Sequence, residues 1–309
     1  MENTRAKTTR NSLILLLTAT IWGMAFVSQS KGMDYMHPFT FNGVRSLIGA
    51  TGILVYILIS RKIAGDKAAK LDWKLNVKAG LLCGIFLTIA STLQQFGIKY
   101  TSVGKAGFIT TLYIIFVPMF GIFLKKKVAP VVWAAAGMAA VGMYLLCMTE
   151  SLRLGAGDIM VFLCAIAFAI QIMTVDHYAA SIDGAVVSCI QFTVCGVVCC
   201  IGALIWGQPT FGQIQEGLGA LLYAGVLSCG VGYTLQIVGQ KGLNPTVAAL
   251  IMSLESVIAT ISGWIAYKIG FLSTDQTLTP RQIAGCVIVF AAVILVQLPP
   301  EWFCFGKKN

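Results

Sequence analysis

The feature that most constrains this sequence is a series of apolar runs, each long enough to cross a lipid bilayer. Runs such as Leu81–Ala90 and Val287–Val296 lie inside longer apolar segments that end at charged residues, glycine or proline. A helix needs roughly 20 residues to cross about 30 Å of hydrocarbon. Lipid cannot satisfy backbone groups, so a spanning segment is a helix or a strand of a closed barrel. Because the runs are continuous and do not alternate, they predict membrane-spanning helices.

The charge content agrees with a lipid-exposed surface. Hydrophobic residues make up 57% of the chain and charged residues 11%, whereas about 25% of a soluble domain is charged. The net charge of +10 would also fit a nucleic-acid binder, but the basic residues flank apolar segments and form no recognition face. We therefore expect the lipid bilayer, and no nucleic acid, as a partner.

Clusters of proline, glycine and charge divide the chain into ten predicted transmembrane helices. They cover residues 11–30, 38–60, 74–97, 104–124, 130–148, 157–178, 184–206, 216–240, 244–267 and 280–298. The first run continues past Trp22 without a convincing cleavage site, so we predict an uncleaved helix and no signal peptide there. The fold class is therefore an all-α integral membrane protein.

Lysine and arginine are distributed unequally between the two sets of alternate loops, and the richer set is expected in the cytoplasm. The richer set holds Arg5, Lys7, Arg10, Arg61, Lys62, Lys67, Lys70, Lys74, Lys78, Lys125, Lys126, Lys127, Lys241, Lys307 and Lys308. The poorer set holds Lys31, Lys99, Lys105, Arg153, Lys268 and Arg281. This bias predicts a multi-pass protein of the bacterial inner (cytoplasmic) membrane, with both termini in the cytoplasm.

An internal repeat divides the chain into two halves. Leu93–Lys99 matches Leu235–Lys241 at an offset of 142, and the match continues without a gap to Tyr113 and Glu255. The first two helices match the sixth and seventh at an offset of 146, which pairs Arg45 with Gln191. The fifth matches the tenth at an offset of 150. We predict five helices in residues 1–150 and five in 151–309; since five is odd, the second copy is inverted.

The order of several short motifs resembles the drug/metabolite transporter superfamily, in its EamA-type branch. The segments that carry the resemblance are Ile21–Gly23, Phe39–Arg45, Ala106–Pro118, Gly157–Asp158, Ser253–Glu255 and Pro280–Gly285. The chain departs from the family pattern at Ser256, where proline is usual, and lacks the usual acid before the fifth and tenth helices. The resemblance implies transport of amino acids, other small metabolites or toxic organic compounds, often outward. It also implies a cavity lined mainly by helices one, three, four, six, eight and nine, and no nucleotide cofactor.

Two charged residues fall inside predicted spans, where an ionisable side chain costs about 2.5–3.5 kcal/mol on insertion scales. Glu255 lies near the middle of its helix and is a candidate for binding a solute amine or carrying a coupling proton. Its alternative is a hydrogen-bonded carboxyl that fixes helix packing. For Arg45 we expect a structural role, either reaching toward the interface or pairing with a helix-end carbonyl or an acid. A clamp for a solute carboxylate is the alternative.

Polar and aromatic side chains inside the spans complete the candidate cavity. Lipid cannot satisfy the amides of four glutamines, so each is expected to line the cavity or to bond another helix. The aromatic candidates can supply cavity walls with a hydroxyl or an indole N–H, although Trp22 also fits a core position. These candidates are Gln94, Gln95, Gln171, Gln236, Tyr113, Tyr233 and Trp22.

These features favour a secondary transporter that works by alternating access. The alternative is a membrane-embedded enzyme or receptor, but two histidines and few buried acids predict no catalytic residues and no metal site. No GxxxxGKS or GxxxxGKT phosphate loop occurs, so no cofactor is expected. Low cavity charge and several amides favour a small polar or zwitterionic solute. A monomer and a homodimer are both compatible with the sequence.

Overall fold

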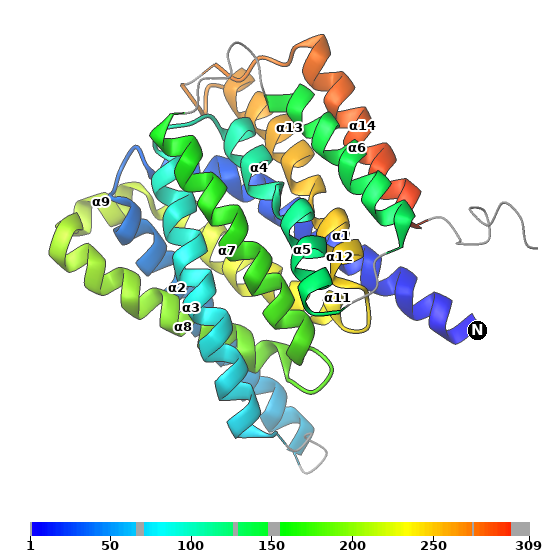
Figure 1. Cartoon of the computed structure of the whole chain (residues 1–309). Coiled ribbons are helices and arrows are strands. Elements are labelled where there is room, and N and C mark those ends of the chain that lie inside the picture. Colours follow the sequence, from blue (N-terminus) through cyan, green and yellow to red (C-terminus); the bar gives the residue numbers. More distant parts are fainter. Residues whose placement is uncertain (1, 66–70, 126–128, 148–154, 274, 298–309) are drawn as a thin grey trace, which may run out of the picture.

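The structure is a computed structural model that describes residues 2–65, 71–125, 129–147, 155–273 and 275–297. Within these residues it is a bundle of helices without a strand (Figure 1). The first half contains α1 (Glu2–Gly32), α2 (Pro38–Ala64), α3 (Trp73–Ile98), α4 (Val103–Thr111), α5 (Tyr113–Phe123) and α6 (Pro130–Cys147). The second contains α7 (Ala156–Tyr178), α8 (Gly184–Gly202), η2 (Ala203–Gly207), α9 (Phe211–Glu216), α10 (Leu218–Leu222), η3 (Tyr223–Gly232), α11 (Tyr233–Gln240), α12 (Pro245–Met252), α13 (Leu254–Lys268) and α14 (Pro280–Gln297).

Eight helical stretches among the described residues are long and apolar enough to cross a membrane. They run over Lys7–Gly32, Pro38–Ala64, Trp73–Ile98, Val103–Phe123, Ala156–Tyr178, Gly184–Gly207, Leu218–Gln240 and Pro245–Lys268. The apolar helices α6 and α14 pack against each other at one side of the bundle (Figure 1) and are represented among the described residues by the shorter apolar stretches Pro130–Gly142 and Pro280–Leu295. The all-helical, multi-pass prediction is confirmed, and the count of ten spans stays a prediction.

The outer surface is apolar and much of the interior is polar, as lipid exposure requires. On α2, for example, Tyr56 and Leu58 are each 61% exposed, while Asn42, Arg45 and Ser46 are buried. In a soluble protein this distribution would leave a large apolar surface in water. The polar side chains instead face other helices, where partners or a cavity can accept them.

Two of the predicted helices are broken in the middle. Residues 104–124 and 244–267 were predicted as continuous, but α4 ends before Leu112 and α12 ends before Ser253. Both residues have a tightened helical backbone, with ψ of −9° and −16°. Hydroxyl groups satisfy carbonyls beside each break: Thr111 Oγ1 donates to Phe108 O at 2.8 Å and Ser253 Oγ to Leu250 O at 2.7 Å. At the offset of 142, the two breaks lie within one residue of each other.

The predicted helix over residues 216–240 also differs from the structure. It consists of α10, the wider π-helix η3 and α11, with the short α9 before them. Within η3, Gly225 and Gly232 meet side chains of Ile48 and Trp22 so closely that a Cβ at either position would overlap them. Glycine therefore brings this stretch against α1 and α2.

Helix contacts occur in matched pairs across the two halves. Gly97 on α3 packs against Val161 on α7, so closely that a Cβ would overlap the valine. Its repeat mate Gly239 on α11 packs in the same way against Leu15 on α1, the mate of Val161. Each half thus places its third helix on the first helix of the other half, which is the relation expected of two repeats.

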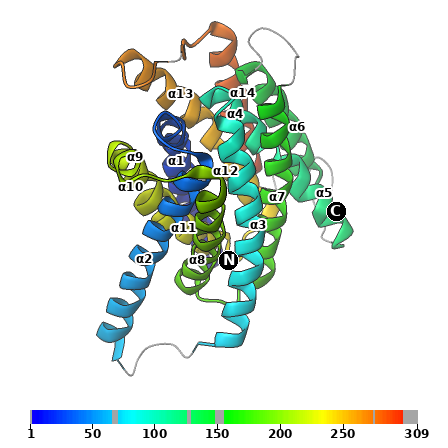
Figure 2. The same ribbon diagram turned by 90° about the vertical axis from the view of Figure 1, so that its left-hand side faces the viewer.

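Loops that the sequence assigns to one side of the membrane also meet in space. Asn11 Nδ2 donates to Lys241 O at 2.8 Å, and the Asp183 N–H donates to Asn76 Oδ1 at 2.8 Å. At this end α2 and α3 extend together beyond the other helices (Figure 2). Several residues used for the orientation lie outside the described part of the chain, as does the predicted boundary at residue 150. These residues are Lys67, Lys70, Lys126, Lys127, Arg153, Lys307 and Lys308. The cytoplasmic side therefore stays a prediction.

Candidate functional site

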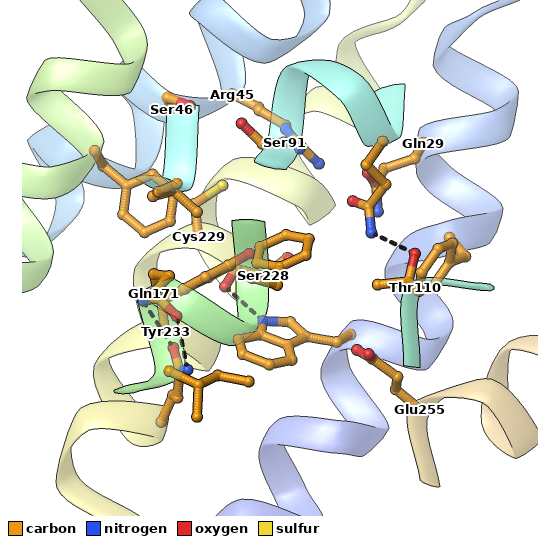
Figure 3. Close-up of a pocket in the computed structure, with 18 of the residues that line it drawn as sticks. Gln29, Arg45, Ser46, Ser91, Thr110, Gln171, Ser228, Cys229, Tyr233 and Glu255 are labelled. Atoms are coloured by element: carbon orange, nitrogen blue, oxygen red, sulfur yellow. Dashed lines mark hydrogen bonds between the residues drawn. The ribbon is translucent and has the colours of Figure 1, made fainter. Parts of the chain in front are cut away.

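A small cavity of about 30 Å³ lies at the centre of the bundle, enclosed by both halves (Figure 3). A water molecule needs roughly 10–15 Å³ by this measure, so the space suits one or two waters. Its lining consists of Trp22, Phe26, Gln29, Arg45, Ser46, Leu87, Ser91, Gln94, Thr110, Tyr113, Phe168, Gln171, Ile172, Phe192, Ser228, Cys229, Tyr233, Gln236 and Glu255. Of the eight residues predicted to line a cavity, all but Gln95 are in this set, and Arg45 joins them.

Glu255 and Tyr113 meet where the two broken helices face each other. The Tyr113 hydroxyl donates to Glu255 Oε1 at 3.0 Å, and both side chains are buried. The residues are repeat mates, and each lies in the first turn of its helix, α13 or α5. The N-terminus of a helix carries a partial positive charge that favours a negative charge. The break therefore gives an intramembrane carboxylate a favourable place.

Arg45 lies across the cavity from Glu255. In Figure 3 the two side chains point into the cavity from opposite sides. The guanidinium of Arg45 lies 5.3 Å from the centre of the Phe41 ring, and the residue is only 5% exposed. Among the residues that the structure describes, Arg45 has no hydrogen-bond or ion-pair partner, and its Nε is fully buried. The predicted pairing with an acid or a helix-end carbonyl is therefore not found among the described residues, and the structural role expected of Arg45 stays a prediction.

The lining amides also join helices. Gln236 Nε2 donates to Gln171 Oε1 at 3.1 Å, with the reverse bond at 3.5 Å, so these amides link α11 to α7. Gln94 Nε2 donates to Thr110 Oγ1 at 3.2 Å and links α3 to α4. Cavity lining and helix bonding, offered as alternatives, thus occur together. Gln95 is the exception: its amide donates to Gln29 O at 3.1 Å and lines no part of the cavity.

Aromatic rings form one wall of the cavity. The rings of Trp22 and Tyr233 lie 4.5 Å apart, and Phe192 meets Tyr233 edge-on at 5.0 Å. The Trp22 indole N–H donates to Ser228 O in the π-helix η3 at 3.4 Å. These rings connect α1, α8 and α11 around a shared polar space.

Comparison with protein families gives an independent result. The model of the EamA-like transporter family matches residues 10–148 and, a second time, residues 155–298. This chain belongs to the EamA-like transporter family. The predicted resemblance is confirmed, and the EamA-like domain is present twice.

Relatives of this EamA-like transporter align with most of the chain. A protein named "Uncharacterized transporter" from Archaeoglobus fulgidus is 28% identical over 290 residues, covering 92% of this chain and 84% of the relative. The "Uncharacterized transporter YwfM" of Bacillus subtilis is 24% identical, covering 94% of each. A solved crystal structure superposes with a TM-score of 0.71 at 16% identity, covering 93% of this chain and 96% of that one, which shows a shared fold.

Part of the cavity lining of this EamA-like transporter was not predicted from the sequence. The resemblance implied a cavity lined mainly by helices one, three, four, six, eight and nine; in the structure α2 also supplies Arg45 and Ser46, and α8 supplies Phe192. The polar residues that were not predicted are Gln29, Ser46, Ser91, Thr110, Ser228 and Cys229. Small polar residues are common in membrane helices, so only Gln29 carried a signal that would have marked it. Among the described residues no group of three or more His, Cys, Asp or Glu could hold a metal ion.

Proposed function

We propose that this EamA-like transporter is a secondary transporter of the cytoplasmic membrane that moves a small polar solute, such as an amino acid, outward by alternating access. In this proposal ten helices form two inverted repeats, residues 1–150 and 151–309, with both termini in the cytoplasm. The observation that carries it is the central cavity at the matched breaks of α4–α5 and α12–α13. Broken helices at equivalent positions of two halves are typical of a transporter binding site.

The size of the cavity fits a closed intermediate of such a cycle. A space of about 30 Å³ holds water but no amino acid. Solute can enter only after helices of the two halves separate at one end. Two halves with equivalent contacts, such as Gly97–Val161 and Gly239–Leu15, can rock in either direction at similar cost. That equivalence supports states open to each side of the membrane.

Glu255 is the group that we assign to the cation or proton. It is the one acidic residue among the lining side chains that the structure describes. Only one of its oxygens accepts from Tyr113, which leaves the other for a solute ammonium or a proton. Without an ammonium or a proton beside it, the buried carboxylate of Glu255 raises the free energy of the protein. The ionised state of Glu255 is therefore favoured when a solute ammonium occupies the cavity.

The test is solute flux in proteoliposomes with and without a pH gradient, measured over a panel of amino acids and other small metabolites. We expect flux of at least one solute, and Glu255→Gln should lower it by roughly 100-fold, in line with about 3 kcal/mol for a buried charged hydrogen bond. The matched control is Glu216→Gln on α9, which makes the same change at an exposed site. Full transport with unchanged pH dependence in Glu255→Gln would disprove the role of Glu255, and no flux of any solute would disprove the transporter.

A further inference from the structure

The least explained group in the molecule is the guanidinium of Arg45. It is 5% exposed, lies inside a membrane-spanning helix and has no acid, carbonyl or amide oxygen as a hydrogen-bond partner in the described chain. Its nearest recorded contact is the face of the Phe41 ring. Arginine stays protonated and carries five N–H donors. A cation–π contact uses none of these donors in a hydrogen bond.

A buried charge without a hydrogen-bonding partner of opposite charge destabilises the folded protein. A ligand that binds during the functional cycle can supply that partner. Interhelical packing does not require a charge at this position, because the repeat mate of Arg45 is the neutral Gln191, also buried on α8. The described structure also contains a partly buried cation with a partner: Lys105 Nζ lies 2.6 Å from Asp158 Oδ2. Arg45 differs in that its donors face the cavity (Figure 3).

We propose that Arg45 binds a carboxylate of the transported solute, and that the solute is a zwitterion held between Arg45 and Glu255. This inference rests on the proposed transport function and deepens it. A guanidinium is a planar fork of donors that fits the two oxygens of a carboxylate. Arg45 and Glu255 are the one basic and the one acidic residue among the described lining side chains. Their opposite signs match one ammonium and one carboxylate, whereas a dianion or a polyamine would leave unbalanced charge.

The surroundings of Arg45 suit an anion. Ser46 and Ser91 line the same part of the cavity, and their hydroxyls can turn toward an incoming oxygen (Figure 3). Among the described residues, the Ser46 hydroxyl bonds only Cys195 Sγ, a weak acceptor, at 3.4 Å. No carboxylate among the described lining residues competes at this end of the cavity. The solute would therefore bind with its carboxylate toward α2 and its ammonium toward α13.

The test is binding of matched ligands to the purified full-length protein, measured as a concentration-dependent rise in the unfolding temperature. The probes are alanine, leucine and phenylalanine, each as the free acid, the carboxamide and the N-acetylated acid. For the amino acids that bind, we expect the free acid to bind roughly 10- to 100-fold more tightly than the carboxamide, as for a hydrogen bond to a charged group. In Arg45→Gln this preference should fall to about one, and Arg45→Lys should keep part of it.

Two variants separate this proposal from a structural role. A structural role predicts that Arg45→Gln weakens acid and carboxamide equally, which would overturn the carboxylate site. Glu255→Gln should keep the acid-to-carboxamide preference and lose discrimination against the N-acetylated acid. Arg61→Gln, at the end of the same helix, should change neither ratio.

If Arg45→Gln does not fold, equal binding of acid and carboxamide by the unaltered protein still disproves the proposal, as does the absence of binding by every probe. Flux of an uncharged solute would refute the zwitterion while leaving the transporter intact.

Discussion

The two halves of the molecule share their helix contacts but differ in their polar chemistry. Gly97 and Gly239 make the same close contact, each on the first helix of the opposite half. At the cavity, however, Glu255 is matched by Tyr113 and Arg45 by Gln191. The difference shows that packing demands similar residues in both halves, while a binding site for one small solute needs each charge only once. Substituting one residue of a repeat pair at a time tests whether packing is shared by both halves and whether the charged groups act in one half alone.

The largest expected effect comes from an ion pair that exists in one half-to-half contact and has no counterpart. Asp158 on α7 is 4% exposed and accepts from Lys105 Nζ at 2.6 Å and Thr101 Oγ1 at 2.9 Å. Its mate is Ser12, and the mate of Lys105 is Val247. Because it leaves a partly buried lysine unpaired, Asp158→Asn should lower the free energy of unfolding by about 3 kcal/mol. Denaturant unfolding of the purified protein in detergent measures this.

The control for this prediction is another ion pair of the same type. Asp34 pairs with Lys31 at 3.0 Å but is 53% exposed, so Asp34→Asn should cost less than about 1 kcal/mol. Ser12→Ala should likewise have a small effect. Equal losses for Asp158→Asn and Asp34→Asn would contradict the asymmetry between the halves.

The next effect should be shared by both halves. Gly97→Val and Gly239→Val each force a side chain into Val161 or Leu15, and overpacking of this kind costs about 1–3 kcal/mol. We expect both variants to unfold at lower temperature by similar amounts. Gly52→Val is the control, since a Cβ at Gly52 meets nothing within 4 Å. A loss at only one of the two glycines would show that the halves do not pack equivalently.

The smallest effect concerns two helix caps that are repeat mates. His37 caps α2 by accepting from Phe39 N at 3.4 Å, and Asp183 caps α8 by accepting from Ala185 N at 3.0 Å. Burial, and secondly the charge of Lys99, lower the pKa of His37 from 6.5. The unfolded chain therefore binds the proton more tightly, so this stability is fully present above pH 6.5 and is lost as the pH falls through the lower folded pKa.

The loss should be about 0.5–1 kcal/mol, the value of a helix cap, and is measured as the unfolding temperature between about pH 8 and about pH 5. His37→Asn replaces the cap with one that does not titrate and should remove this part of the pH dependence. His177→Asn should preserve it. Retention of the full pH dependence in His37→Asn would rule out the assignment.

Much of the fold follows from the sequence because lipid imposes a simple rule on helix length. The predicted spans 74–97 and 157–178 agree closely with α3 (Trp73–Ile98) and α7 (Ala156–Tyr178). The breaks at Leu112 and Ser253 were not predicted, since neither residue is a proline or glycine. They depend on hydroxyl groups that bond carbonyls in the same turn. Serine and threonine hydroxyls compete here with the backbone hydrogen bonds of the helix, and this competition leaves no periodic pattern in the sequence.

The candidate site was harder to predict than the fold. Gln94 and Gln95 are adjacent, and neighbouring residues on a helix point about 100° apart, so both could not face the cavity. Deciding between them requires the position of α3 against α1, where the Gln95 amide meets the Gln29 carbonyl. Arg45 was expected to reach toward the interface or to pair with a carbonyl or an acid, because the sequence does not show which groups surround a buried charge. Both cases depend on the neighbours of a side chain, which a single sequence does not specify.

If Glu255 carries a proton in the proposed cycle, the opposite charges of Arg45 and Glu255 also determine how membrane voltage acts on the protein. Arg45 stays charged, so the pair carries no net charge while Glu255 is ionised and one positive charge once Glu255 is protonated. Moving one elementary charge across the whole of a 100 mV potential changes its energy by about 2.3 kcal/mol. Voltage thus distinguishes the two protonation states of the pair, and a cell that changes its membrane potential would change their balance.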